Sequence, residues 1–202
     1  MAIIQSGATT DLLTIDVTSK AARTTNYDSE GRDLSYESKE TFFAASGPWT
    51  PPATPSDMWI MNGSASKTIR IYHISFHATQ TTGGVNTFYL IRRSTANSAG
   101  TAIAATLIKA DTTNLTATAT AQHYTANPTP GATVGNIRVV RAFCPAPAGL
   151  NSINMELANT TPNIISQPIT LRGTAEGVAL NFNGVALPAG MSMSLNVMWT
   201  EE

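Results

Sequence analysis

Residues 191–200 read MSMSLNVMWT, and this stretch decides the fold class. Apolar side chains occupy the odd-numbered positions, while serine, asparagine and threonine fall mainly on the even-numbered ones. Alternate side chains point to opposite faces of an extended chain, so the pattern predicts a β-strand with one buried face. Residues 178–182 (VALNF) alternate in the same way. Asn183-Gly184 and Pro188-Ala189-Gly190 predict turns between the two strands.

Further stretches rich in β-branched and aromatic residues extend this pattern along the chain. We expect strands at Thr68–Ala78, Thr87–Arg93, Ala102–Lys109, Thr116–Tyr124, Ile137–Phe143, Ser152–Leu157 and Ile169–Leu171. No segment of useful length has apolar residues at helical spacing. About eight strands, with turns roughly every 8–15 residues, predict an all-β protein built as an antiparallel β-sandwich. A jelly roll is the expected arrangement, because eight strands in two sheets protect most strand edges.

The first 40 residues differ in composition from the rest. Almost half of all charged residues lie here, and few apolar residues are present to build a core. Residues 12–17 and 34–38 are strand candidates, and Asp28-Ser29-Glu30-Gly31 between them predicts a turn. We therefore expect residues 1–46 to form an extended N-terminal arm with short strands, stabilised by a partner or by the body. The alternative is one more hairpin of a single domain.

Residues 47–55 read GPWTPPATP and contain four prolines. Proline forbids a helix interior and favours extended backbone, so residues 47–56 are predicted to form a stiff connection. The sandwich body is then expected over residues 57–202. Trp49 is a candidate interface anchor because it lies in this connection, although it could equally fold back on its own domain. Trp199 belongs to the buried face of the last strand and is predicted to lie in the core.

Composition and charge exclude several classes of protein. Charged residues make up 12% of the chain, about half of the usual share of roughly 25%. The net charge is −1 without a basic stripe, so we expect no nucleic-acid partner. Arg92, Arg93, Arg138 and Arg141 are interpreted as ordinary surface charge. The low charge has two interpretations: a surface that contacts other subunits, or a neutral surface hydrated by hydroxyl groups.

Membrane segments and disulfides are not expected either. No stretch approaches the roughly 20 apolar residues of a membrane span. The opening MAIIQSGATT lacks the positive region and long apolar run of a signal peptide. The single cysteine, Cys144, cannot form an intrachain disulfide. Its apolar context before Pro145 suits a buried thiol better than a reactive one.

The sequence contains no convincing metal site. His73 and His77 are four residues apart, which on a strand separates them by roughly 13 Å, too far to share one ion. Asp28, Glu30 and Asp33 surround Gly31, but a calcium loop needs more oxygen ligands and a closing bidentate carboxylate. We predict that the histidines lie on the surface or at an interface, and that the acidic residues form a solvated turn.

No catalytic arrangement is visible in the sequence. A glycosidase needs two carboxylates about 5–9 Å apart, and nothing pairs the acidic residues that follow residue 56. A serine nucleophile needs a base and a sharp turn, but the chain has no G-x-S-x-G motif and His123 has no obvious acidic partner. Phosphate-binding glycine loops are also absent. We therefore expect a non-enzymatic protein without catalytic, metal or cofactor-binding residues.

Four segments resemble small structural proteins of tailed bacteriophages. These are residues 12–34 (LLTIDVTSKAARTTNYDSEGRDL), 64–74 (SASKTIRIYHI), 171–182 (LRGTAEGVALNF) and 199–202 (WTEE). The likeness is spread over most of the chain and consists of strands and turns, with no catalytic signature. It resembles in particular the β-sandwich proteins that decorate or cement the phage head.

The resemblance implies a virion component that assembles in the cytoplasm of the host bacterium. It implies binding to the major capsid protein and to further copies of the chain, with a trimer favoured. The candidate interface residues are Leu12, Leu13, Ile15, Lys20, Arg23, Tyr27, Arg32 and Trp49. The alternative is a tail or fibre-tip module that recognises host surface glycans.

Overall fold

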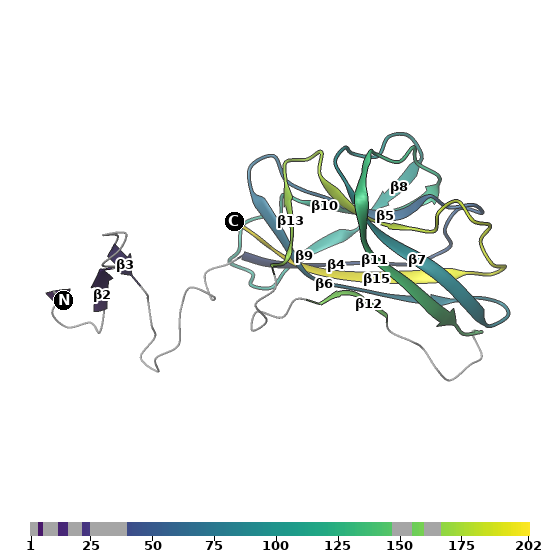
Figure 1. Ribbon diagram of the computed structural model, residues 1–202, viewed down its shortest axis with the longest axis horizontal. Coiled ribbons are helices and arrows are strands. Elements are labelled where there is room, and N and C mark those ends of the chain that lie inside the picture. The colour runs from purple at the N-terminus through teal and green to yellow at the C-terminus, as the bar shows by residue number, and fades with distance from the viewer. Residues whose placement is uncertain (1–3, 6–11, 16–21, 25–39, 147–154, 160–166) are drawn as a thin grey trace. The chain divides into compact units, whose positions relative to one another are not determined.

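The computed structural model describes residues 4–5, 12–15, 22–24, 40–146, 155–159 and 167–202 (Figure 1). Every regular element in these residues is a β-strand, so the predicted all-β class is confirmed. The chain divides into two compact units, residues 1–39 and residues 40–202. In the first unit, β1 (Ile4–Gln5), β2 (Leu12–Ile15) and β3 (Ala22–Thr24) form an antiparallel sheet in the order β1-β2-β3. The strand predicted at residues 34–38 lies outside the described residues.

The second unit, here called the body, contains two antiparallel sheets packed face to face (Figure 1). Sheet I has the order β11-β7-β14-β5-β10-β8, and sheet II has the order β12-β6-β15-β4-β9 with β13 also paired to β6. The strands of sheet I are β5 (Asp57–Asn62), β7 (Gly84–Arg93), β8 (Thr101–Ala104), β10 (Thr120–Ala126), β11 (Thr133–Cys144) and β14 (Gly177–Asn181). The strands of sheet II are β4 (Glu40–Trp49), β6 (Thr68–Thr79), β9 (Thr106–Lys109), β12 (Met155–Asn159), β13 (Ile169–Arg172) and β15 (Ser192–Glu201).

The strand order of the described body is that of a jelly roll. In chain order the principal strands are β4, β5, β6, β7, β11, β12 with β13, β14 and β15. Sheet II joins the sixth, third, eighth and first of these, and sheet I joins the fifth, fourth, seventh and second. Successive principal strands therefore alternate between the two sheets except at β7 and β11, which are neighbours in sheet I, and the first and last strands pair with each other. This is the jelly-roll arrangement that the sequence predicts, although two of its eight strands, β4 and β5, were not among the expected strands.

The core lies between the two sheets and depends strongly on β15. Its inward side chains Met193, Leu195, Val197 and Trp199 are each at most 2% exposed, as the alternating sequence predicts. The Trp199 ring stacks on Phe42 of the neighbouring β4, with ring centroids 5.7 Å apart. Burying a large apolar side chain contributes about 1.5–3 kcal/mol, so these four side chains together contribute about 6–12 kcal/mol.

The structure differs from the predicted arm and connection at β4. Residues 40–49 were assigned to the arm and the proline-rich connection, but they form a strand of sheet II between β15 and β9. The body therefore begins at Glu40 and not at Asp57. The sequence conceals this strand because Phe42 faces the core while the adjacent Phe43 is 42% exposed, so apolar residues occupy both faces and the period of two is lost.

The end of β4 shows why Gly47-Pro48 can occur inside a strand. The pairing of β15 with β4 shifts register between Met193 and Leu195, opposite this dipeptide. Such a bulge tolerates proline, which has no N–H to donate to the ladder. Gly47 has φ of +108°, and a Cβ atom there would lie 2.5 Å from the Met193 carbonyl oxygen. Only glycine fits this close backbone approach.

The strand predicted at Ala102–Lys109 is divided at Ala105. The first part, β8, pairs with β10 in sheet I, and the second part, β9, pairs with β4 in sheet II. At the crossing, the Ala105 N–H donates to the Ala121 carbonyl oxygen at 2.8 Å. A continuous run of β-forming residues cannot reveal such a crossing, because local propensity is satisfied equally in either sheet.

Glu201 fixes the end of β15 from inside the protein. It is only 3% exposed, and its carboxylate accepts hydrogen bonds from the Trp199 indole N–H at 3.0 Å and the Ala119 N–H at 3.0 Å. The Thr118 N–H and hydroxyl also donate to it, at 2.9 Å and 2.6 Å. The backbone N–H groups of Thr118 and Ala119 thus bond to a side chain instead of a neighbouring strand. This explains why β10 begins at Thr120, four residues after its predicted start at Thr116.

A buried ion pair connects three strands of sheet I. Arg93 at the end of β7 donates to both carboxylate oxygens of Asp57 at the start of β5, at 2.6 Å and 3.1 Å. Asn181 at the end of β14 donates to the same carboxylate at 2.7 Å. Arg93 is 4% exposed, so its interpretation as ordinary surface charge is wrong. The bidentate geometry and the added amide satisfy the buried carboxylate, as a buried charge requires.

Replacing Asp57 by alanine tests this pair. The substitution leaves a buried guanidinium without its carboxylate, which typically costs about 3–5 kcal/mol of unfolding free energy. Urea unfolding followed by tryptophan fluorescence measures the loss, and the Asp57→Ala/Arg93→Met double variant should recover part of it. A loss below about 1 kcal/mol in the single variant would contradict a structural role for the pair.

Candidate interaction surfaces

The interface candidates of the arm stay predictions. Leu12, Leu13 and Ile15 lie in β2, and Arg23 lies in β3, where it pairs in register with Thr14. Lys20, Tyr27 and Arg32 lie outside the described residues. The strand positions place three apolar candidates on one short segment, which fits their assignment to a contact but does not test it.

Trp49 belongs to the core of the body. It is 6% exposed, and its ring lies against His123 with ring centroids 4.8 Å apart. The alternative in which this tryptophan folds back on its own domain is therefore the correct one. A side chain buried in this way offers no surface to a partner.

His123 is a buried neutral histidine. Its Nδ1 atom has no hydrogen-bond partner within the described part of the chain. Burial lowers the pKa of His123 below its usual value of 6.5, because the low-dielectric surroundings disfavour the imidazolium. His123 therefore packs as an aromatic ring against Trp49, and no described carboxylate orients it as a general base.

His73 and His77 lie on β6, as the sequence predicts. His73 Nε2 is 3.7 Å from Glu156 Oε1 on the neighbouring β12, at the long end of ion-pair contact. Among residues 40–146, 155–159 and 167–202, no group of three or more histidine, cysteine, aspartate or glutamate side chains could hold a metal ion. The histidines thus belong to the polar part of the outer face of sheet II.

Cys144 is a fully buried thiol, as its apolar context predicts. Burial raises the pKa of this thiol, and a hydrogen bond with the Asn86 side chain opposes the effect only partly. The reactive thiolate is therefore disfavoured at neutral pH.

An exposed apolar row crosses the outer face of sheet II, and we call it the sheet II row. Ile108 of β9 pairs in register with Phe43 of β4, and Phe43 pairs with Met198 of β15. Met198 pairs in turn with His73 of β6. Directly opposed residues of antiparallel strands share one face and lie in contact distance. Phe43 is 42% exposed and Ile108 is 54% exposed, so the row presents large apolar side chains to solvent.

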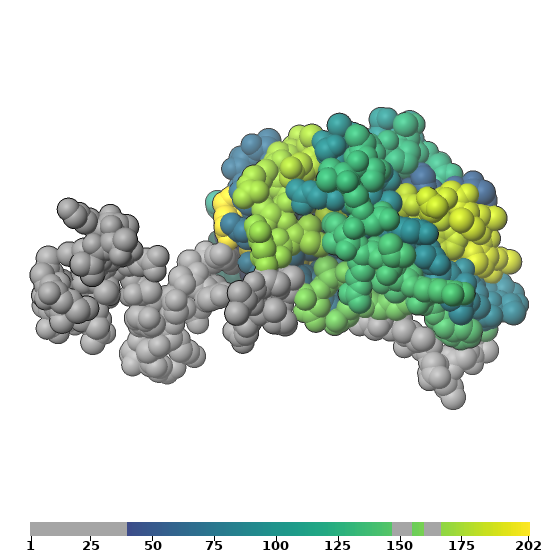
Figure 2. All heavy atoms as spheres, in the orientation of Figure 1, coloured from purple at the N-terminus to yellow at the C-terminus, as the bar shows by residue number. Residues whose placement is uncertain are grey.

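A second apolar area lies on the outer face of sheet I. Phe143 of β11 pairs with Val85 of β7, and Val139 of β11 pairs with Tyr89 of β7. The side chains of Phe143, Val85 and Val139 are exposed. In the space-filling view, β11 lies on the face of the body turned toward the viewer (Figure 2). Among the described strands β11 is an edge of sheet I, but register shifts near Gly135 and Ile137 distort it. Bulges of this kind hinder addition of a further strand.

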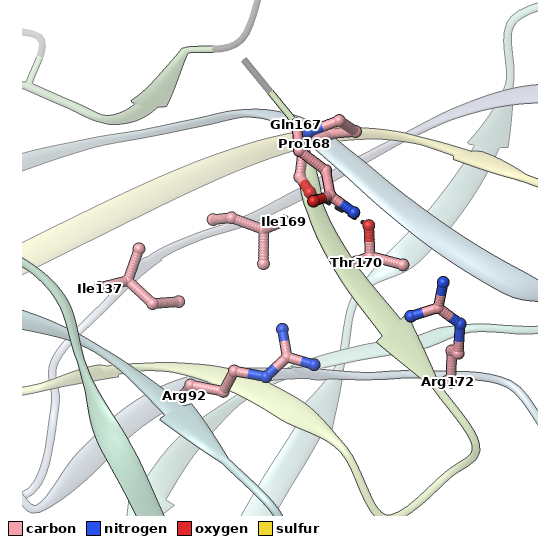
Figure 3. A pocket seen from close by; sticks show the side chains of 7 residues that line it. All are labelled: Arg92, Ile137, Gln167, Pro168, Ile169, Thr170 and Arg172. Atoms are coloured by element: carbon pink, nitrogen blue, oxygen red, sulfur yellow. Dashed lines mark hydrogen bonds between the residues drawn. The ribbon is translucent and has the colours of Figure 1, made fainter.

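A hollow of about 300 Å³ opens between the edges of the two sheets (Figure 3). Arg92 of β7 and Ile137 of β11 contribute from sheet I, and β13 with the two residues before it contributes from sheet II. The full lining is Arg92, Ile137, Gln167, Pro168, Ile169, Thr170 and Arg172. The guanidinium groups of Arg92 and Arg172 both turn toward the hollow, and the side chains of Ile137 and Ile169 lie across from them.

Comparison with protein-family models, with curated proteins and with solved structures finds no match for this chain. In the residues that the structure describes, no helix is long and apolar enough to cross a membrane. Information on function therefore comes from the surfaces of the body and from the four sequence motifs.

The buried histidine gives a pH-dependent prediction. In the unfolded chain His123 binds a proton near pH 6.5, whereas burial in the folded chain lowers its pKa. The folded state therefore keeps its full stability above about pH 6.5 and loses stability as the pH falls below that value. Urea unfolding at about pH 7 and about pH 5 should show a smaller acid-induced loss for His123→Leu than for the unaltered protein. The partly exposed His73→Gln variant is the control. Equal losses in all three proteins would show that His123 does not carry the effect.

Proposed function

We propose that this protein is a non-enzymatic structural component of a tailed-phage virion, a capsid decoration or cement protein. In this role it binds the major capsid protein and other copies of itself, and it stabilises the head. The observation that carries the proposal is the sheet II row, because it combines exposed apolar side chains with the strand, β4, that directly follows the charge-rich first 39 residues. The assignment to the virion rests on the resemblance of residues 12–34, 64–74, 171–182 and 199–202 to phage head proteins.

The row suits contact with a second copy of the chain. Isolated apolar side chains are common on protein surfaces, but aligned ones on adjacent strands form a continuous surface that favours association. Phe43 and Met198 are large and flank each other in register. A trimer, the state implied by the resemblance, would bury this row between neighbouring bodies.

The arm suits contact with the capsid. Residues 1–39 form a compact unit separate from the body, and their many charges can complement a charged partner surface. Binding that occurs only in the folded, assembled head stabilises that head by mass action. In this proposal the arm attaches the protein to the capsid, and the sheet II row mediates self-association.

The alternative is a tail or fibre-tip module that binds host glycans. The hollow lined by Arg92 and Arg172 favours this alternative, because it offers a recessed polar site on the body. The two functions differ in the partner that retains the purified protein: phage heads or host cells.

Deleting residues 1–39 tests the arm. The truncated protein should lose binding to empty or expanded capsids in co-sedimentation and should no longer raise their melting temperature, while its own thermal unfolding remains cooperative. Binding by the truncated protein at unchanged affinity would refute the role of the arm. Retention on host cells instead of heads would favour the tail alternative.

Polar substitution of the sheet II row tests self-association. Phe43→Ser combined with Ile108→Ser should raise the oligomer dissociation constant at least about tenfold, because two exposed apolar anchors are removed from the contact. Analytical ultracentrifugation measures the change. The matched control is Val139→Ser with Phe143→Ser, two apolar residues of similar exposure on sheet I. The proposal fails if the control weakens association more than the row variant does.

A further inference from the structure

We propose that the hollow between β7, β11 and β13 binds the carboxylate of an acidic sugar. The inference concerns Arg92 and Arg172, which the virion role does not use, and it stands independently of that role. It assigns a ligand class to a hollow whose lining contains none of the residues of the sheet II row.

Glu176 holds the guanidinium of Arg92 in position at the hollow. Its Nη2 atom donates to Glu176 Oε2 at 2.8 Å, and the backbone N–H of Arg172 donates to the same oxygen at 2.7 Å. Glu176 lies in the turn that carries the chain from β13 in sheet II to β14 in sheet I. One carboxylate thus fixes the Arg92 guanidinium and the end of β13 together, which reduces the ordering cost of binding a ligand between them.

Arg172 supplies the unpaired charge. Its guanidinium has no hydrogen bond or ion pair to any residue that the structure describes, whereas Arg92 shares its charge with Glu176. Two guanidinium groups and one carboxylate leave a single positive charge at the hollow. A planar guanidinium donates two parallel N–H bonds to a carboxylate, so Arg172 with the free donors of Arg92 matches a monoanion.

The rest of the lining matches a sugar ring. Thr170 Oγ1 donates to the Pro168 carbonyl oxygen at 3.1 Å and keeps its lone pairs for a ligand hydroxyl. The Gln167 amide can both donate and accept. Ile137 and Ile169 lie across from the arginines and can cover the C–H face of a ring (Figure 3). The volume of about 300 Å³ is near the lower limit for small-molecule sites, which fits one sugar residue and not a polymer chain.

Titration of the full chain with D-glucuronate tests the proposal, with D-glucose as the uncharged comparison. Saturation-transfer NMR or calorimetry should detect glucuronate binding that weakens with added salt, and no comparable binding of glucose. Arg172→Gln should weaken glucuronate binding about tenfold or more, because the unpaired guanidinium is lost. Arg141→Gln, an exposed arginine on β11 outside the lining, should leave the affinity unchanged.

Ile137 provides a second test that does not alter the arginines. It is 39% exposed, so polar replacement is compatible with folding. Ile137→Glu adds a negative charge at the hollow and should weaken glucuronate binding, whereas Ile137→Lys should not. Equal affinities for glucuronate and glucose, no detectable binding, or insensitivity to Arg172→Gln would each overturn the proposal. Inorganic sulfate or phosphate that binds as tightly as glucuronate would also overturn it, because the sugar ring would then contribute nothing.

Discussion

The last strand of the body, β15, lies between the first strand, β4, and the third, β6, and it pairs with both along most of its length. Neither neighbour has another described partner that could replace these hydrogen bonds over the same residues. Sheet II is therefore continuous only because β15 joins β4 to β6. The inward side chains of β15 also pack in the core, and the Trp199 indole N–H donates to the buried Glu201 carboxylate of the same strand. Backbone pairing, core packing and polar satisfaction thus depend on one strand.

Although the chain has few charged residues, two of its carboxylates, Asp57 and Glu201, are buried. Asp57 binds Arg93 and Asn181 across sheet I, and Glu201 caps the segment before β10. Both are fully occupied by donors, so they hold strands in position and are not available as an acid and base pair. This explains how the body can be low in charge and still specify one arrangement of strands.

The outer surfaces of the body differ in chemistry. Sheet II presents an aligned apolar row centred on Phe43, which suits contact with protein. The hollow lined by β7, β11 and β13 instead presents Arg92 and Arg172, which suits an anion. The jelly roll produces this separation, because its strands cross between sheets at the ends and leave two independent faces and an open edge. A single small body can therefore carry an assembly surface and a binding site without competition between them.

The sequence by itself determined the all-β class and the buried face of β15, because a period of two is a local property of an extended chain. One more step of that alternation also places Glu201 on the buried face. Only the tertiary structure decided that Glu40–Trp49 joins sheet II, that the strand predicted around Ala105 divides between sheets, and that Arg93 is buried. These features depend on which distant strands become neighbours. Partners so far apart in the chain leave no periodic signal in either segment.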